Sequence, residues 1–168
     1  MVRKSLGLAA AFLAVVLVGC ASGDSISIEV FPYEGDGFGT IPFRASGVAV
    51  DEAVVCENGT MEQDHLESPE GEIITSEEGG ELYEAARADR GVMDTYAVQE
   101  FVCDDGSGTF TMKTHTRSDF AKPESQQDIP TWEIENGTGD YAGLSGSGDA
   151  TMDLGAAAVA LVGEVQKG

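Results

Sequence analysis

The stretch that most constrains the fold of this chain is NGTGDYAGLSGSGD, residues 136–149. Its two halves are similar, because Asn-Gly-Thr-Gly-Asp is followed nine positions later by Ser-Gly-Ser-Gly-Asp. Glycine permits tight turns and a close approach between backbones. Tyr141 and Leu144 are then the apolar anchors that hold a glycine-flanked segment against a hydrophobic core. The stretch therefore predicts a piece of compact β-sheet.

Two kinds of binding site that use glycine-rich segments do not fit this stretch. Calcium-binding β-rolls need at least three copies of G-G-x-G-x-D-x-U-x, whereas two copies are present here and the aspartate is one position out of place. A phosphate-binding G-x-G-x-x-G is also missing, since the spacing from Gly137 to Gly143 is one residue too long and Asp140 would repel a pyrophosphate. We expect no metal site and no cofactor.

Alternation of polar and apolar residues predicts strands along most of the chain. Residues 25–30, 43–50 and 109–117 have this pattern, residues 93–103 are rich in β-forming residues, and the apolar run 157–165 is expected to close the sheet as a final strand. Within 109–117, Phe110 and Met112 are expected on one face and Lys113 on the other. Trp132 and Ile134 share a face by the same rule. Many short strands separated by turns indicate an all-β sandwich or barrel.

The connections between these segments are predicted from turn-forming residues. Asn58-Gly59 favours a hairpin turn over residues 57–60. A second turn is expected at residues 104–108, and residues 115–129 have the composition of a surface loop. Residues 77–90 fit either a strand or a short helix, with Ser76 as its cap.

The C-terminal part of the chain resembles a known superfamily. Trp132 and Ile134, followed by GTGDYAGL and by Gly-Ser-Gly, are similar to the signature of allene oxide cyclase and dirigent-like β-barrels, in particular secreted bacterial members of unknown function. The resemblance covers about residues 101–152. Its signature positions are Trp132, Gly137, Gly139, Tyr141, Gly143, Leu144, Gly146 and Gly148.

The resemblance implies a single antiparallel eight-stranded, calycin-like barrel. Such a barrel is either filled by side chains or holds one small ligand. Cyclases of this superfamily isomerise an oxidised fatty acid, and dirigent members steer the coupling of phenoxy radicals. The match lies in a structural turn, so the resemblance implies the fold and assigns no catalytic residue.

The N-terminus resembles that of a bacterial lipoprotein. Arg3 and Lys4 precede an apolar run over residues 6–18, which is too short to span a membrane and suits a signal peptide. The run ends in Leu-Val-Gly-Cys, which is similar to a lipobox. We therefore expect residues 1–19 to be removed and Cys20 to carry a diacylglycerol. Residues 20–24 would form a short lipidated tether and residues 25–168 the barrel domain, at the cell envelope on the extracytoplasmic side of the membrane.

The net charge of the chain restricts its partners. The formal net charge is −21, and it becomes −23 once Arg3 and Lys4 leave with the signal peptide. Nucleic acid is therefore not an expected partner.

Cys56 and Cys103 remain after lipidation of Cys20, and we expect them to form a disulfide in this oxidising compartment, with two buried thiols as the alternative.

Three further side chains are candidate ligands. His65 lies near Glu62, Asp64 and Glu67, which allows a weak divalent-metal site, but an ordinary surface position is favoured. His115 is expected to be exposed to solvent beside Lys113 and Arg117. Trp132 is expected to fill the core rather than to bind a ligand.

These patterns leave three functional hypotheses. The first is a membrane-anchored lipoprotein whose barrel binds a small apolar molecule or has a structural role. The second is a cyclase or isomerase with an acid in the barrel mouth. The third is a protein-interaction module that uses the acidic exterior. A hollow barrel favours the first two hypotheses, and a filled barrel favours the third.

Overall fold

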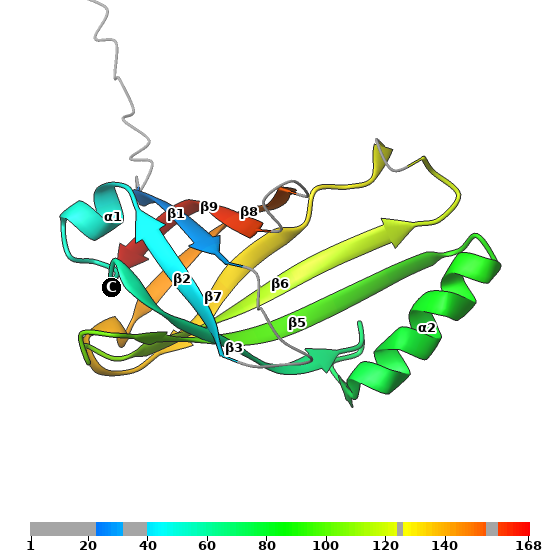
Figure 1. Ribbon diagram of the computed structural model, residues 1–168, viewed down its shortest axis with the longest axis horizontal. Coiled ribbons are helices and arrows are strands. Elements are labelled where there is room, and N and C mark those ends of the chain that lie inside the picture. The colour runs from blue at the N-terminus through cyan, green and yellow to red at the C-terminus, as the bar shows by residue number, and fades with distance from the viewer. Residues whose placement is uncertain (1–22, 32–39, 124–125, 154–157) are drawn as a thin grey trace, which may run out of the picture.

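The protein forms a closed, antiparallel eight-stranded β-barrel (Figure 1). The computed structural model describes residues 23–31, 40–123, 126–153 and 158–168. The barrel strands follow one another as β2-β1-β9-β8-β7-β6-β5-β3, and pairing of β2 with β3 closes the ring. They are β1 (Asp24–Val30), β2 (Ile41–Ser46), β3 (Asn58–Glu67), β5 (Val92–Cys103), β6 (Thr109–Asp119), β7 (Thr131–Gly137), β8 (Leu144–Asp153) and β9 (Ala158–Lys167). The predicted all-β barrel is thus confirmed.

The remaining elements lie at the two ends of the barrel. The short helix α1 (Val48–Asp51) connects β2 to β3, and the 3-10 turn η2 (Gly139–Tyr141) connects β7 to β8. At the opposite end β5 and β6 extend past the other strands, and helix α2 (Ser76–Ala88) lies along β5 (Figure 1). The two-residue strand β4 (Ile73–Ile74) pairs with the end of β3.

The segment at residues 77–90, for which the sequence allowed either a strand or a helix, is largely helical, since α2 covers Ser76–Ala88. Its N-cap is Thr75 rather than the predicted Ser76. The Thr75 hydroxyl accepts a hydrogen bond from the backbone N–H of Glu78, whose carboxylate accepts one from the backbone N–H of Thr75. This reciprocal arrangement is a capping box, which satisfies two backbone donors at the start of a helix.

The barrel end nearest α1 is packed solid with aromatic side chains. Phe101 and Phe110 stack with ring centroids 5.0 Å apart, and Phe43 contacts Phe101 edge-on at 5.2 Å. Tyr141 approaches Phe110 edge-on at 5.6 Å. All four rings are buried. This geometry is the favourable one for aromatic pairs, and it forms the main part of the core.

Trp132 fills the adjacent layer of the core because two glycines make room for its indole. Gly148 and Gly163 are opposite each other on β8 and β9. A Cβ atom would lie 2.8 Å from the indole at Gly148 and 2.6 Å from it at Gly163. Trp132 is 2% exposed, and its indole N–H donates to the backbone carbonyl of Asp149 at 3.2 Å. The prediction that Trp132 fills the core is confirmed.

The other glycines of the signature let two turns interlock at this end of the barrel. Gly139 has a φ of 59°, and a Cβ atom there would lie 2.3 Å from the carbonyl oxygen of Ser107. Ser107 in turn hydrogen-bonds the Tyr141 hydroxyl at 2.6 Å. Tyr141 and Leu144 are both buried, so they are the predicted anchors. The glycine-rich stretch at residues 136–149 therefore forms the turn from β7 to β8 and the first part of β8, and it belongs to the barrel sheet as predicted.

The structure contains the predicted disulfide and departs from three local predictions. Cys56 and Cys103 are bonded, with Cα atoms 6.0 Å apart, as predicted. The turn predicted at residues 57–60 is wrong, because Gly59 lies within β3 and its missing side chain leaves space for the Phe43 ring. The strand predicted for residues 43–50 ends at Ser46, since α1 begins two residues later. The surface loop predicted for residues 115–129 is wrong in its first part, because β6 continues to Asp119.

Candidate functional site

The barrel is hollow in the half that faces α2. A cavity of about 220 Å³ lies inside it. Its lining comes from six strands and the residue before β7: Val30, Met61, Ala97, Gln99, Thr114, Thr116, Pro130, Ala150, Thr151, Val159 and Leu161. We call this space the lumen cavity.

The cavity exists because inward-facing side chains become smaller along the strands. On β5 the inward positions run from Phe101 through Gln99 to Ala97, and on β6 they run from Phe110 to Thr114. Successive inward positions alternate with outward ones along each strand. The interior of an eight-stranded barrel is just wide enough for large side chains to fill. Ala97 and Thr114 are smaller than Phe101 and Phe110. The described side chains therefore leave a cavity in the half of the barrel that faces α2.

The lumen cavity is mainly apolar and contains a small polar group. Gln99 is half-buried, and its side-chain carbonyl accepts a hydrogen bond from the Thr114 hydroxyl at 3.0 Å. Thr116 adds a second hydroxyl along the same wall. Among the described residues that line it, none is ionisable. An apolar cavity with a few polar groups is the usual form of a small-molecule site.

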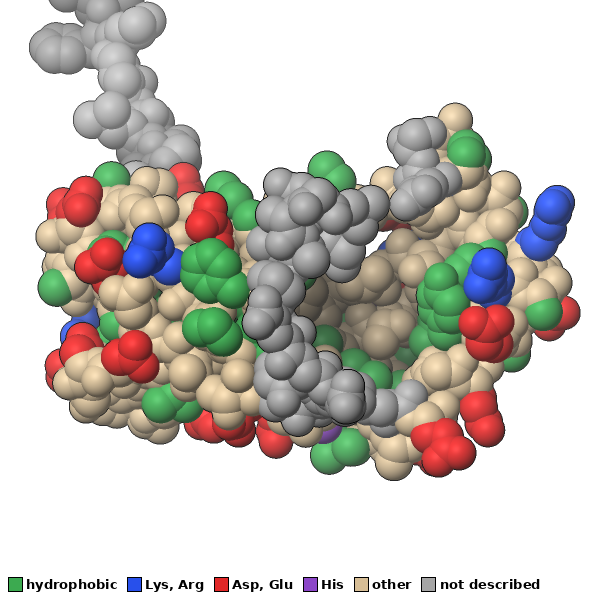
Figure 2. All heavy atoms as spheres, in the orientation of Figure 1, with side chains coloured by type: hydrophobic (Ala, Val, Ile, Leu, Met, Phe, Trp, Pro, Cys, Tyr) green, Lys and Arg blue, Asp and Glu red, His purple; other side chains and the backbone are tan. Residues whose placement is uncertain are grey.

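A second, wider space adjoins the lumen cavity. This mouth cavity measures about 630 Å³ and shares Thr116 and Pro130 with the lumen cavity. Tyr83 of α2 and Phe120 form its aromatic side, with ring centroids 5.0 Å apart. Figure 2 shows the surface hollowed between the barrel body and the α2 end of the molecule. The two cavities together give room for a molecule longer than the lumen alone holds.

Basic side chains at the mouth are paired with carboxylates. Arg117 donates to both oxygens of Asp94, the shorter contact being 2.8 Å, and its Nε lies 3.8 Å from Asp128. Lys122 lies 3.6 Å from Asp119 and 3.8 Å from Asp128. The positive charge at the mouth is therefore balanced locally.

The outer wall of the barrel carries a network of ion pairs around both histidines. His65 contacts Asp64 through Nδ1 and Glu67 through Nε2, each at 3.0 Å, and Lys113 donates to Glu67. The hydrogen bond with Glu67 contributes most to raising the pKa of His65. The hydrogen bond from Lys113 contributes most to lowering the pKa of Glu67. Lys113 also lies 3.6 Å from Glu135, and the described part of the chain holds no cluster of three or more metal-ligating side chains.

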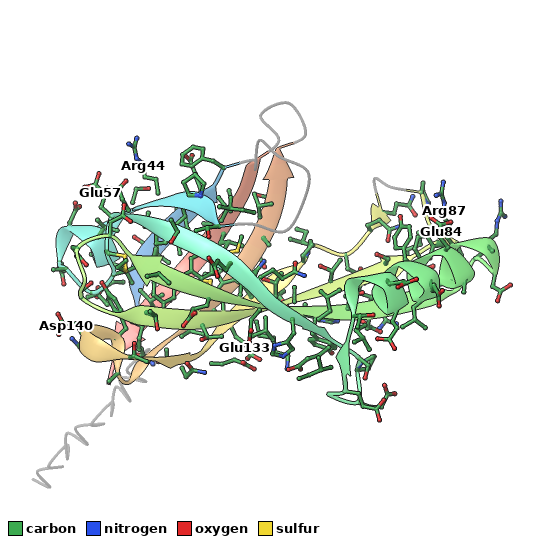
Figure 3. All side chains as sticks on the ribbon, turned by 60° about the horizontal axis from the view of Figure 1, so that its bottom comes forward. Arg44, Glu57, Glu84, Arg87, Glu133 and Asp140 are labelled. Atoms are coloured by element: carbon green, nitrogen blue, oxygen red, sulfur yellow. A yellow bond between two sulfur atoms is a disulfide. The ribbon has the colours of Figure 1, made fainter. Side chains whose placement is uncertain are left out.

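His115 is part of the same outer wall, and its predicted exposure is only partly correct. Its side chain is 36% exposed, it hydrogen-bonds Asp94 at 2.9 Å, and it stacks on the Tyr96 ring at 4.6 Å. The hydrogen bond with His115 is the main cause of the lowered pKa of Asp94. A groove of about 440 Å³ crosses this wall, and exposed Glu133 projects from β7 on the same side (Figure 3). Lys113 and His115, which line this groove, are paired with Glu67 and Asp94.

The predicted site residues and the cavity occupy different parts of the barrel. None of the signature residues from Trp132 to Gly148 lines the lumen cavity. Cys20 lies outside the described residues. The lumen residues Gln99, Thr114 and Thr116 were not singled out from the sequence, although their inward positions follow from the same alternation that placed Phe110 and Met112 inside.

Comparisons with other proteins add no assignment. The chain matches no protein-family model, no curated protein and no solved structure. Within the ranges that the structure describes, no helix is long and apolar enough to cross a membrane.

Proposed function

We propose that this protein is a lipid-anchored, extracytoplasmic barrel that binds a small apolar molecule in its lumen. The observation that supports ligand binding is the lumen cavity, since the described side chains fill the barrel at one end and leave a cavity at the other. Cores are normally packed with few voids larger than a water molecule. A cavity of about 220 Å³ inside the barrel, beside a wider space that shares two of its lining residues, is therefore best explained by an occupant.

The proposed location rests on the N-terminal sequence. The Leu-Val-Gly-Cys motif ending at Cys20 supports acylation, and β1 begins at Asp24, only four residues later. So short a tether would hold the barrel beside the membrane surface. Apolar molecules concentrate in membranes, so this position suits a protein that takes up a hydrophobic ligand.

Binding is favoured over the cyclase or isomerase hypothesis by the chemistry of the lumen. Acid–base catalysis needs a group with a tuned pKa within reach of the substrate. Gln99 and the two threonines do not titrate in the relevant range. Every described carboxyl whose pKa moves, including Glu67 and Asp94 on the outer wall, has it lowered rather than raised. The lumen is thus better suited to hold a molecule than to protonate one.

Native mass spectrometry of the full chain from its own host tests this proposal. We expect an adduct of a few hundred daltons beyond the mass of the acylated chain. Ala150 is buried on the lumen side of β8, so Ala150→Phe would fill part of the cavity and remove the adduct. Val162→Phe adds a comparable ring at an exposed position of β9 and should leave the adduct in place. Absence of any adduct, or equal occupancy in both variants, would contradict the proposal.

A further inference from the structure

We infer that the lumen ligand is uncharged and carries an oxygen acceptor that receives a hydrogen bond from the Gln99 side-chain amide. The inference rests on the proposed function and goes beyond it, since it names the chemical class of ligand and the residue that selects it. It follows from three features of the cavity: the orientation of Gln99, the distribution of charge and the size of the lumen.

The first feature is the orientation of the Gln99 amide. The Thr114 hydroxyl donates to the Gln99 carbonyl oxygen at 3.0 Å, so the amide nitrogen points away from Thr114. The amide nitrogen has two donors, and no acceptor for them lies within the described part of the chain. Buried side-chain nitrogens and oxygens of that part all have partners. The Gln99 nitrogen is therefore open to the cavity and presents a donor to whatever occupies it.

The second feature is the distribution of charge. The described lining of the lumen cavity has no ionisable side chain. A carboxylate placed there would lose its hydration without gaining a counter-ion, which is strongly unfavourable. At the mouth, Arg117 and Lys122 are already paired with carboxylates. The whole chain carries a net charge of −21, which adds repulsion for any anion that approaches.

The third feature is the size of the lumen. An engineered apolar cavity of about 150 Å³ binds benzene. A cavity of about 220 Å³ accommodates a somewhat larger apolar group, such as a fused pair of rings. The remainder of a longer ligand would lie in the mouth beside Tyr83 and Phe120. A ketone, ester, ether or alcohol on an apolar skeleton therefore has the required chemistry.

Three naphthalenes of nearly equal shape test the inference. They are 2-acetylnaphthalene, 2-ethylnaphthalene and 2-naphthoate, which present a neutral acceptor, no acceptor and an anion. Their dissociation constants for the purified full-length chain are measured by ligand-observed NMR titration. The ketone is expected to bind at least about tenfold more tightly than the naphthoate, because the anion loses its hydration in the lumen.

Gln99→Met supplies the residue-specific test, since methionine has a similar length and no donor. The ratio of ketone affinity to hydrocarbon affinity is expected to fall about fivefold, the effect of one hydrogen bond. Glu100→Gln, at the neighbouring exposed position, is the matched control and should leave the ratio unchanged.

The outcomes separate this inference from the proposed function. Hydrocarbon binding that is lost in Ala150→Phe, together with an unchanged ratio in Gln99→Met, would overturn the role of Gln99 and leave ligand binding intact. Naphthoate binding as tight as that of the ketone would overturn the preference for an uncharged ligand. Failure of all three probes to bind would overturn the proposed function and this inference together.

Discussion

The fit between Trp132 and its two facing glycines makes a quantitative prediction about stability. In Gly163→Ala the new methyl group would lie 2.6 Å from the Trp132 indole, 2.2 Å from the Ser147 carbonyl oxygen and 2.8 Å from the Gly148 Cα. Two of these three atoms belong to the backbone of β8, so rotation of the indole alone cannot relieve the overlap. Overpacking of a core costs about 1–3 kcal/mol. We expect Gly163→Ala to lower the free energy of unfolding by about 3 kcal/mol, the upper end of that range.

The assay is urea denaturation of the variant and of the parent chain, with the disulfide intact. Gly80→Ala is the matched control, because the same methyl group added within α2 meets no atom within 4 Å. It should stabilise the chain by up to about 1 kcal/mol, the difference in helix propensity between the two residues. The opposite signs distinguish a steric effect from a general effect of losing a glycine.

A second variant identifies the indole as one source of the strain. Trp132→Phe removes the outer ring of the indole, so combining it with Gly163→Ala should cost less than the sum of the two single changes. Residues in contact commonly deviate from additivity by about 0.5–3 kcal/mol. A Gly163→Ala loss below about 1 kcal/mol, or strict additivity with Trp132→Phe, would refute the argument that the indole and the glycines are matched.

Three other predictions concern the outer wall, the disulfide and the N-terminus. The raised pKa of His65 means that its contribution to stability is complete below its ordinary value of 6.5 and is lost as the pH rises through the folded-state pKa. The lowered pKa of Glu67 means that its contribution is complete above 4.5 and is lost on acidification. Urea midpoints should therefore decline on both sides of pH 4.5–6.5, and His65→Gln should abolish the alkaline decline; a decline that persists in this variant would contradict the assignment. Reduction of Cys56–Cys103, which are 47 residues apart, should lower the free energy of unfolding by about 4 kcal/mol by the loop-entropy relation, and an unchanged urea midpoint would contradict this. Mass spectrometry of the N-terminal peptide from the host should find acylated Cys20 as the first residue, whereas an intact signal segment or a bare thiol would exclude the lipoprotein assignment.

Local sequence patterns were sufficient where local rules decide the structure. Alternation placed Phe110 and Met112 inside the barrel, because successive strand residues must point to opposite faces. The pairing of Cys56 with Cys103 followed from the expected compartment and the number of cysteines. Local rules failed at Gly59, where Asn-Gly favours a turn in isolation. In the folded chain that glycine lies in a strand, since the Phe43 ring, 16 residues earlier, occupies the space beside it.

The sequence by itself determined that this chain forms many short strands and that its glycine-rich stretch is part of the sheet, and it predicts a lipoprotein N-terminus. Only the tertiary structure decided that the barrel is hollow at one end. The cavity cannot be read from any one segment of the sequence, because Ala97, Thr114 and Ala150 line it from three different strands. Each of these residues is ordinary in its own strand. The cavity between them is enclosed only when the eight strands pair into a closed barrel.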